Sequence, residues 1–221
     1  MATSKLKNAF NAAPSGEEVK DFCLAAGRGA REDIVAFLDK YPAAIDTVST
    51  AGTTALVCAA SGRRPDIVAL LLDRGADVNA KCPLSEETAL HAATKQARQD
   101  IIYLLLDRGA DIRAQNGWGQ SALTMCVLVH ESASTAEMLL GRGAAAEGEI
   151  EQLLEKKSHF SVAMQALLSQ WPEKEKRRAE EKKARELAAD IADYSPALKR
   201  DMPAAHPIKA PRRMGPHEKI V

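Results

Sequence analysis

The sequence predicts an all-α solenoid of helix-turn-helix repeats with extended finger loops, followed by a charged helix and a disordered tail. Thr/Ser-Ala-Leu triplets begin at Thr54, Thr88 and Ser121, in steps of 34 and 33 residues. A second pattern, an apolar run that closes with Gly-Ala, recurs every 34 residues at the following glycines: Gly75, Gly109 and Gly143. Two patterns that keep one register indicate stacked repeats rather than a single globular core.

Each copy of the repeat is expected to contain two short helices. In the first copy, Ser15 with Glu18 three residues later has the form of a capping box. In the central copy, Ile101, Leu104 and Leu105 fall on one apolar stripe at helical spacing. The glycine after each second helix suits a left-handed C-cap. Because one such hairpin buries too little apolar surface to fold alone, neighbouring copies must cover one another.

The outer copies depart from this pattern and define the expected boundaries. The fourth copy carries one extra residue between its helices, around residues 130 to 134, and a last degenerate copy is expected at 150–156 and 160–171. The expected organisation is an N-terminal segment (1–17), about five repeats (18–171), a charged helix (172–194) and a disordered Pro-rich basic tail (195–221).

Two stretches carry a resemblance to a known family. Thr88-Ala-Leu-His-Ala-Ala93 and Gly75-Ala-Asp-Val-Asn-Ala80 resemble the ankyrin repeat, whose pattern runs Gly-x-Thr-Pro-Leu-His-x-Ala-Ala and then Gly-Ala-Asp-x-Asn-Ala. The family's proline is alanine in all three copies, and its histidine remains only at His91. We expect His91 to be a structural hydrogen-bonding residue. The resemblance covers roughly residues 18 to 171 and is strongest over 51 to 116.

The resemblance implies a non-enzymatic protein-protein interaction module, an adaptor or scaffold that binds a partner through the concave face of the stack. The rival interpretation is a dedicated inhibitor or immunity-type regulator of one enzyme or toxin, and a third is an enzyme with an ankyrin-like shell. The repeat register places thirteen residues on that face, called here the concave-face residues: Thr50, Ala51, Thr53, Ser61, Lys81, Leu84, Ser85, Glu87, Lys95, Gln96, Gln115, Trp118 and Gln120.

Trp118 is the expected anchor of that surface. It stands between Gly117 and Gly119 at a finger tip, and tryptophan is enriched among residues that dominate binding energy. The alternative is that its ring folds back over its own stack.

No catalytic, metal or cofactor motif is present in the sequence. None of the five histidines has an i, i+4 histidine partner. The stretch Gly27-Arg-Gly29 lacks the Gly-Lys-Ser/Thr ending of a phosphate-binding loop and suits a turn. We therefore expect no catalytic residue, no metal and no cofactor.

Composition limits the partner and the compartment. The charges of thirty basic and thirty acidic residues cancel, so neither nucleic acid nor a membrane surface is an expected partner. We expect the protein to be a monomer. Cys23, Cys58 and Cys126 suit a core and Cys82 a loop, a scatter typical of a reducing compartment. The expected location is the cytoplasm; an organelle transit peptide is the alternative for the acid-free N-terminus.

The two C-terminal segments each leave an alternative open. In the charged helix, a narrow apolar stripe favours either a solvated helix or a short coiled coil that binds a partner: Ala184, Leu187, Ala188 and Ile191. In the tail, basic residues at 209, 212 and 213 suit either a solubilising segment or contact with an acidic partner.

The expected organisation predicts the result of limited proteolysis. Trimming should remove residues from about 195 onward and leave a resistant core that ends near Trp171 or somewhat beyond, because a Pro-rich polar segment lacks apolar surface to dock. Mass spectrometry of the digest measures the end point. Resistance of the tail in the free protein would contradict this boundary.

Overall fold

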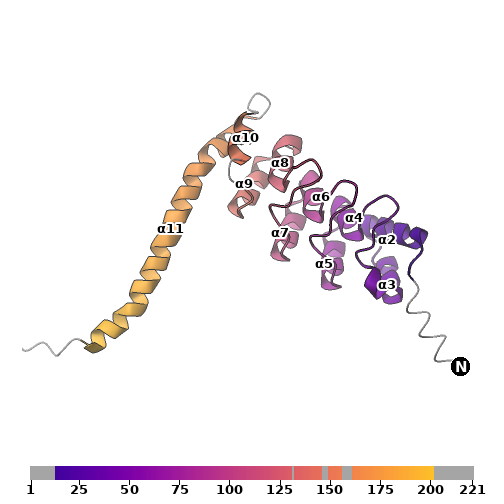
Figure 1. The fold of residues 1–221 in the computed structure, drawn as a ribbon, viewed down its shortest axis with the longest axis horizontal. Helices are drawn as coiled ribbons and strands as arrows, with labels where there is room; N and C mark the ends of the chain where they lie inside the picture. Colours follow the sequence, from indigo (N-terminus) through magenta and orange to yellow (C-terminus); the bar gives the residue numbers. More distant parts are fainter. Residues whose placement is uncertain (1–12, 131, 146–148, 156–160, 202–221) are drawn as a thin grey trace, which may run out of the picture. The chain divides into compact units, whose positions relative to one another are not determined.

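The computed structural model describes residues 13–130, 132–145, 149–155 and 161–201, and these residues form helices and loops without any strand. The helices follow one another in pairs (Figure 1), so the predicted all-α repeat fold is confirmed. The pairs are α2 (Gly16–Arg28) with α3 (Arg31–Lys40), α4 (Ala55–Ser61) with α5 (Pro65–Asp73), α6 (Ala89–Lys95) with α7 (Gln99–Asp107), α8 (Ala122–Met125) with α9 (Ala133–Gly141), and α10 (Glu149–Glu155) with α11 (Val162–Asp201).

The first helices of the repeats line up in one row and the second helices in another (Figure 1). In the inner row, α2 packs on α4, α4 on α6 and α6 on α8. Small residues permit this close packing: Ala59 and Ala60 of α4 are fully buried. At the end of α4, a Cβ added to Gly62 would lie 2.1 Å from the carbonyl oxygen of Gly27. The two repeats therefore meet backbone to backbone at this point.

The core of the stack consists of aliphatic side chains from both rows. Ile67 and Leu71 of α5, and Ile101 and Leu105 of α7, have no exposed surface. The predicted stripe on α7 is partly wrong, because Ile102 is fully buried whereas residue 104 is only half-buried. The reason is that α7 packs on α6 and also on the neighbouring α5, so its buried face is wider than one stripe.

The ends of the helices have the expected capping groups. The predicted capping box is confirmed, since Ser15 Oγ accepts from the backbone N–H of Glu18 at 3.3 Å and the Glu18 carboxylate accepts from the N–H of Ser15 at 2.9 Å. The three glycines that follow the second helices have φ values of 91°, 87° and 84°, which confirms the left-handed caps. The backbone N–H of the residue that follows each glycine donates to a carbonyl oxygen of the preceding helix. Ala110 N–H, for example, donates to Leu105 O at 3.0 Å.

The fourth copy accommodates its extra residue inside the inner helix. The chain from Ser121 to Gly143 is one residue longer than the stretch from Thr88 to Gly109. In the structure α8 continues into a π-helical turn, η2 (Cys126–His130), before α9 begins. A π-helical turn contains one residue more than an α-helical turn, so the insertion is taken up without moving the glycine cap.

The C-terminal part of the chain differs from the expected segmentation. The chain divides into two compact units, with the boundary between Gln170 and Trp171. However, α11 runs without a break through Pro172 and Pro196 to Asp201. The predicted end of the charged helix at 194 is therefore too early, because the Ala-, Leu- and Lys-rich residues after Pro196 also favour helix.

Several predictions fall on residues outside the described ranges or on an exposed helix face. Residues 1–12 and 202–221 lie outside the described residues, and with them most of the predicted N-terminal segment and basic tail. On α11, Leu187 of the apolar stripe is 61% exposed. Among the described residues, no helix has the length and apolarity that crossing a membrane requires.

The Leu105→Ala substitution should lower the free energy of unfolding by about 2–5 kcal/mol, through lost apolar burial and a cavity. Denaturant melts measure the change. The same substitution at the exposed Leu187 serves as a control and should change stability by less than about 0.5 kcal/mol. Equal effects at the two positions would contradict the placement of Leu105 in the core.

Candidate partner-binding surface

The concave-face residues lie in the finger loops that precede α4, α6 and α8 and at the C-terminal ends of α4 and α6. Each of the thirteen is at least partly exposed. Two of them are large apolar side chains that water contacts over most of their surface, Leu84 at 83% and Trp118 at 68%. Large exposed apolar groups on a folded surface indicate a binding site when they cluster.

Contacts between neighbouring fingers join these residues into one surface. The Gly117 N–H donates to Ser85 O at 2.8 Å, and Lys81 Nζ donates to Gln115 O at 3.2 Å. Toward the preceding repeat, Leu84 lies against the finger that contains Gly52, because a Cβ on Gly52 would be 2.8 Å from Leu84 Cδ1. The structure therefore brings Lys81, Ser85 and Leu84 together with residues of adjacent repeats.

The finger that carries Trp118 is held by a buried asparagine. Asn116 is 4% exposed, and its Oδ1 accepts from the backbone N–H groups of Trp118 at 3.0 Å and of Gln120 at 2.9 Å. The loop is thus fixed from inside, while the indole is exposed rather than folded back over the stack. Sequence reasoning did not single out Asn116, although its position between a repeat and a Gly-Trp-Gly tip is suited to such a turn.

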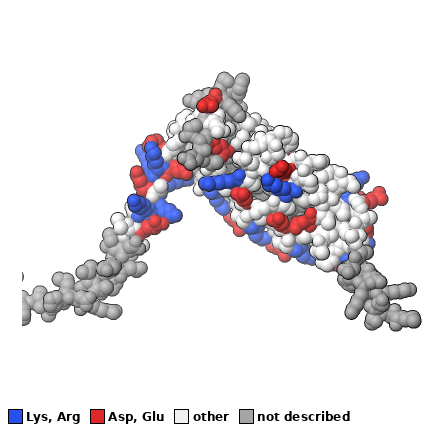
Figure 2. All heavy atoms as spheres, in the orientation of Figure 1, with Lys and Arg blue, Asp and Glu red and all other residues white. Residues whose placement is uncertain are grey.

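Opposite charges alternate on the surface. Lys95 contacts Glu87, and Lys81 lies 3.3 Å from Glu86. Figure 2 shows acidic and basic side chains interspersed over the face of the repeats that it draws. The charged groups on the face that Figure 2 draws therefore do not concentrate a field of one sign there.

An arginine that sequence reasoning missed also joins two repeats. Arg63 lies in the turn between α4 and α5, and its Nη2 donates to Gln96 Oε1 at 3.1 Å. Its φ of 60° is left-handed, as is the φ of 51° at Ala97, which occupies the same place in the next repeat. The shared repeat position is the sequence signal that would have pointed to this turn.

Two further apolar side chains are exposed at the end of the fourth inner helix. Leu128 is 39% exposed and Val129 is 56% exposed, and both lie in the π-helical turn η2. They extend the set of exposed apolar groups beyond the finger tips.

His91 is buried and acts as a link within and between repeats, as predicted. Its Nδ1 accepts from the backbone N–H of Thr88 at 3.2 Å, so Nε2 carries the proton and donates to Gln120 O at 3.1 Å. Burial lowers the pKa of His91, since the charged form is disfavoured away from water. The residue is therefore a structural hydrogen-bonding group.

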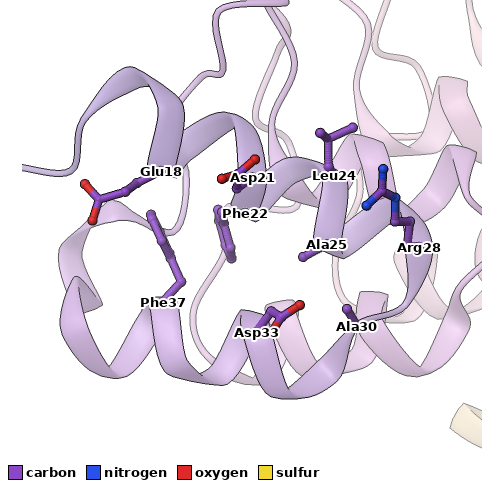
Figure 3. A pocket seen from close by; sticks show the side chains of 9 residues that line it. All are labelled: Glu18, Asp21, Phe22, Leu24, Ala25, Arg28, Ala30, Asp33 and Phe37. Atoms are coloured by element: carbon purple, nitrogen blue, oxygen red, sulfur yellow. The ribbon is translucent and has the colours of Figure 1, made fainter.

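A separate hollow of about 430 Å³ lies between the two helices of the first repeat (Figure 3). Leu24 and Arg28 of α2 and Asp33 of α3 line it, together with the stacked rings of Phe22 and Phe37, whose centroids are 4.2 Å apart. None of the concave-face residues lines this hollow.

The cysteines depart in part from the expectation. Cys23 and Cys126 are buried as predicted, but Cys58 is only half-buried. Cys82 is in a loop and is nevertheless buried, because Glu86 N–H donates to Cys82 O at 2.7 Å and Cys82 N–H to Glu87 O at 2.9 Å, which folds the loop over its side chain. In the described part of the chain, no group of His, Cys, Asp and Glu is arranged to hold a metal ion.

Comparison with known proteins agrees with this geometry. Residues 22–116 match the family model for ankyrin repeats, in three copies. No curated protein matches the chain. The paired helices, the glycine caps and the matched segment together show that residues 22–116 form ankyrin repeats.

The burial of His91 predicts how stability depends on pH. Because the folded state holds its pKa below that of an unfolded histidine, the unfolded chain binds more protons once the pH falls below about 6.5. The stability that the neutral ring provides is present above that pH and is lost below it. Denaturant melts at about pH 8 and about pH 5 measure the loss.

The His91→Gln variant is the control, since an amide keeps a donor and an acceptor but does not titrate. It should be less stable than the parent protein at pH 8 and should lose less stability on acidification. An identical pH dependence in both proteins would contradict this role of His91.

Proposed function

We propose that this protein is a non-enzymatic adaptor that binds a partner protein through the concave-face residues. Ankyrin repeats generally serve as protein-protein interaction modules. The observation that carries the proposal is the exposure of Leu84 and Trp118 on neighbouring fingers that are hydrogen-bonded to each other. Side chains of this size lose unfavourable contact with water when a partner covers them.

The rigidity of the fingers supports the proposal. Asn116 fixes the Trp118 loop, and Ser85 ties it to the preceding finger. A surface that is already ordered loses little conformational entropy on binding, so more of the contact energy appears as affinity.

The charge pattern favours a protein over a nucleic acid. The pairs Glu87–Lys95 and Lys81–Glu86 neutralise one another, and the whole chain has a net charge of zero. Binding to nucleic acid rests on basic groups that neutralise phosphates. A partner that presents apolar side chains ringed by polar groups fits this surface better.

The proposal extends to the rest of the chain. The repeats at 18–171 are sufficient for binding, and residues 172–221 are dispensable for it. The protein acts as a monomer in the cytoplasm, where a reducing environment suits its free cysteines.

The Trp118→Ala substitution should weaken binding to the partner by about 2 kcal/mol or more, roughly thirtyfold, with little change in the melting temperature. Calorimetry with a partner identified by native pull-down measures the affinity, and thermal melts run alongside. Tyr103→Ala is the control: Tyr103 lies on α7 of the outer row, 41% exposed beneath the Arg142 guanidinium, and its loss should change affinity far less.

Three outcomes count against the proposal. Normal binding by Trp118→Ala would remove the anchor of the surface. Poor binding together with a large fall in melting temperature would make Trp118 a packing residue. A single stoichiometric enzyme or toxin in the pull-down would favour a dedicated inhibitor over an adaptor.

A further inference from the structure

Two cysteines that are far apart in sequence meet at the interface between the first and second repeats. Cys23 lies on α2 and Cys58 on α4, the two inner helices that pack on each other. Both thiols contact Thr53: Cys23 Sγ donates to Thr53 O at 3.6 Å, and Cys58 Sγ donates to Thr53 Oγ1 at 3.4 Å. The two side chains therefore converge on one residue from opposite helices.

The helix backbones approach closely beside the two thiols. A Cβ placed on Gly27, one helical turn after Cys23, would lie 3.9 Å from the Cβ of Cys58. Each thiol also shifts the pKa of the other, as expected of neighbouring groups.

The environments of the two thiols differ in a way that suits a nucleophile and its partner. Cys58 is half-buried and open to a small reagent, whereas Cys23 is buried. The neighbouring Cys23 lowers the pKa of Cys58 most, and Thr53 adds to the effect, although burial opposes it. The pKa of Cys23 is raised, first by the neighbouring Cys58 and then by burial. Cys58 therefore supplies the thiolate and Cys23 keeps its proton.

We propose that Cys58 and Cys23 form an oxidation site at which a hydroperoxide joins the first two repeats by a disulfide bond. The proposal rests on the convergence of the two thiols on Thr53 at the α2–α4 interface and on the partial exposure of Cys58. It does not depend on the proposed partner binding.

The reaction is balanced with hydrogen peroxide as the oxidant. The Cys58 thiolate attacks one peroxide oxygen, the S–O bond forms as the O–O bond breaks, and the leaving hydroxide takes a proton to become water. The Cys23 sulfur then attacks the Cys58 sulfenic acid. The S–S bond forms as the S–O bond breaks, and the leaving hydroxide combines with the Cys23 proton as a second water. Two thiols lose two electrons in total, and the peroxide gains them; an added dithiol reduces the disulfide to two thiols again and is itself oxidised.

The disulfide would fasten the first repeat to the second. In a linear array each repeat contacts only its neighbours, so α2 and α3 are held mainly through the α4 side. A covalent link at this interface closes the chain between Cys23 and Cys58 and restricts the unfolded state. The melting temperature of the oxidised protein should rise by about 5 °C or more.

The test uses the full-length protein, reduced, freed of reductant and exposed to a small excess of hydrogen peroxide. Alkylation followed by non-reducing peptide mapping should find one disulfide between the peptides that contain Cys23 and Cys58, with Cys82 and Cys126 still alkylated. Dithiothreitol should restore all four thiols. A disulfide between Cys58 and Cys82, a disulfide between two chains, or no loss of thiols would overturn the proposal.

Variants distinguish the nucleophilic thiol from the thiol that attacks the sulfenic acid. Cys82→Ala is the matched control, a neighbouring buried thiol whose loss should leave the crosslink intact. Cys23→Ala should leave Cys58 as a sulfenic acid that dimedone traps, and Cys58→Ala should abolish the reaction. Dimedone labelling of Cys23 in the Cys58→Ala protein at the parental rate would overturn the assignment of Cys58 as the nucleophile.

Discussion

The close approach of neighbouring inner helices is the constraint on which the rest of the structure depends. Gly62 and Gly27 meet with no room for a Cβ, and the buried alanines of α4 let α2 and α6 pack on either side. A single repeat cannot bury its apolar face, so each repeat is stable only because its neighbours cover it. The same approach places the fingers side by side and brings Cys23 to Cys58. Fold, binding surface and thiol pair thus have one physical origin.

Polar contacts between repeats fix the register of the stack more than they stabilise it. Arginines that precede the cap glycines each reach back to an aspartate one repeat earlier, at 3.4, 2.7 and 2.7 Å: Arg74 to Asp39, Arg108 to Asp73 and Arg142 to Asp107. These side chains are well exposed, and such pairs contribute about 0–1 kcal/mol each. Loss of one buried leucine costs more than that. His91 differs because it is buried, and its bond to Gln120 links α6 to the finger of the next repeat.

Local features of the fold could be predicted from the sequence, whereas contacts between repeats could not. The 34-residue period, the Ser15 cap and the left-handed glycines depend on the residue and its immediate neighbours. The half-burial of Cys58 and its convergence with Cys23 on Thr53 depend on the distance between two helices, which one sequence does not encode in any local pattern. The continuation of α11 through Pro172 was missed because proline usually ends a helix. Exposure of the concave-face residues followed from the repeat register, but the role of Asn116 beneath Trp118 required coordinates.

Site-specific photocrosslinking tests most directly the claim that the fingers bind a protein. A photoreactive phenylalanine analogue in place of Trp118 occupies the finger tip, and the same analogue in place of Tyr103 occupies the outer row; both parent side chains are exposed aromatics. After irradiation with the partner present, the account predicts a crosslinked heterodimer from position 118 and little or none from position 103. A crosslink from position 103 alone would contradict it.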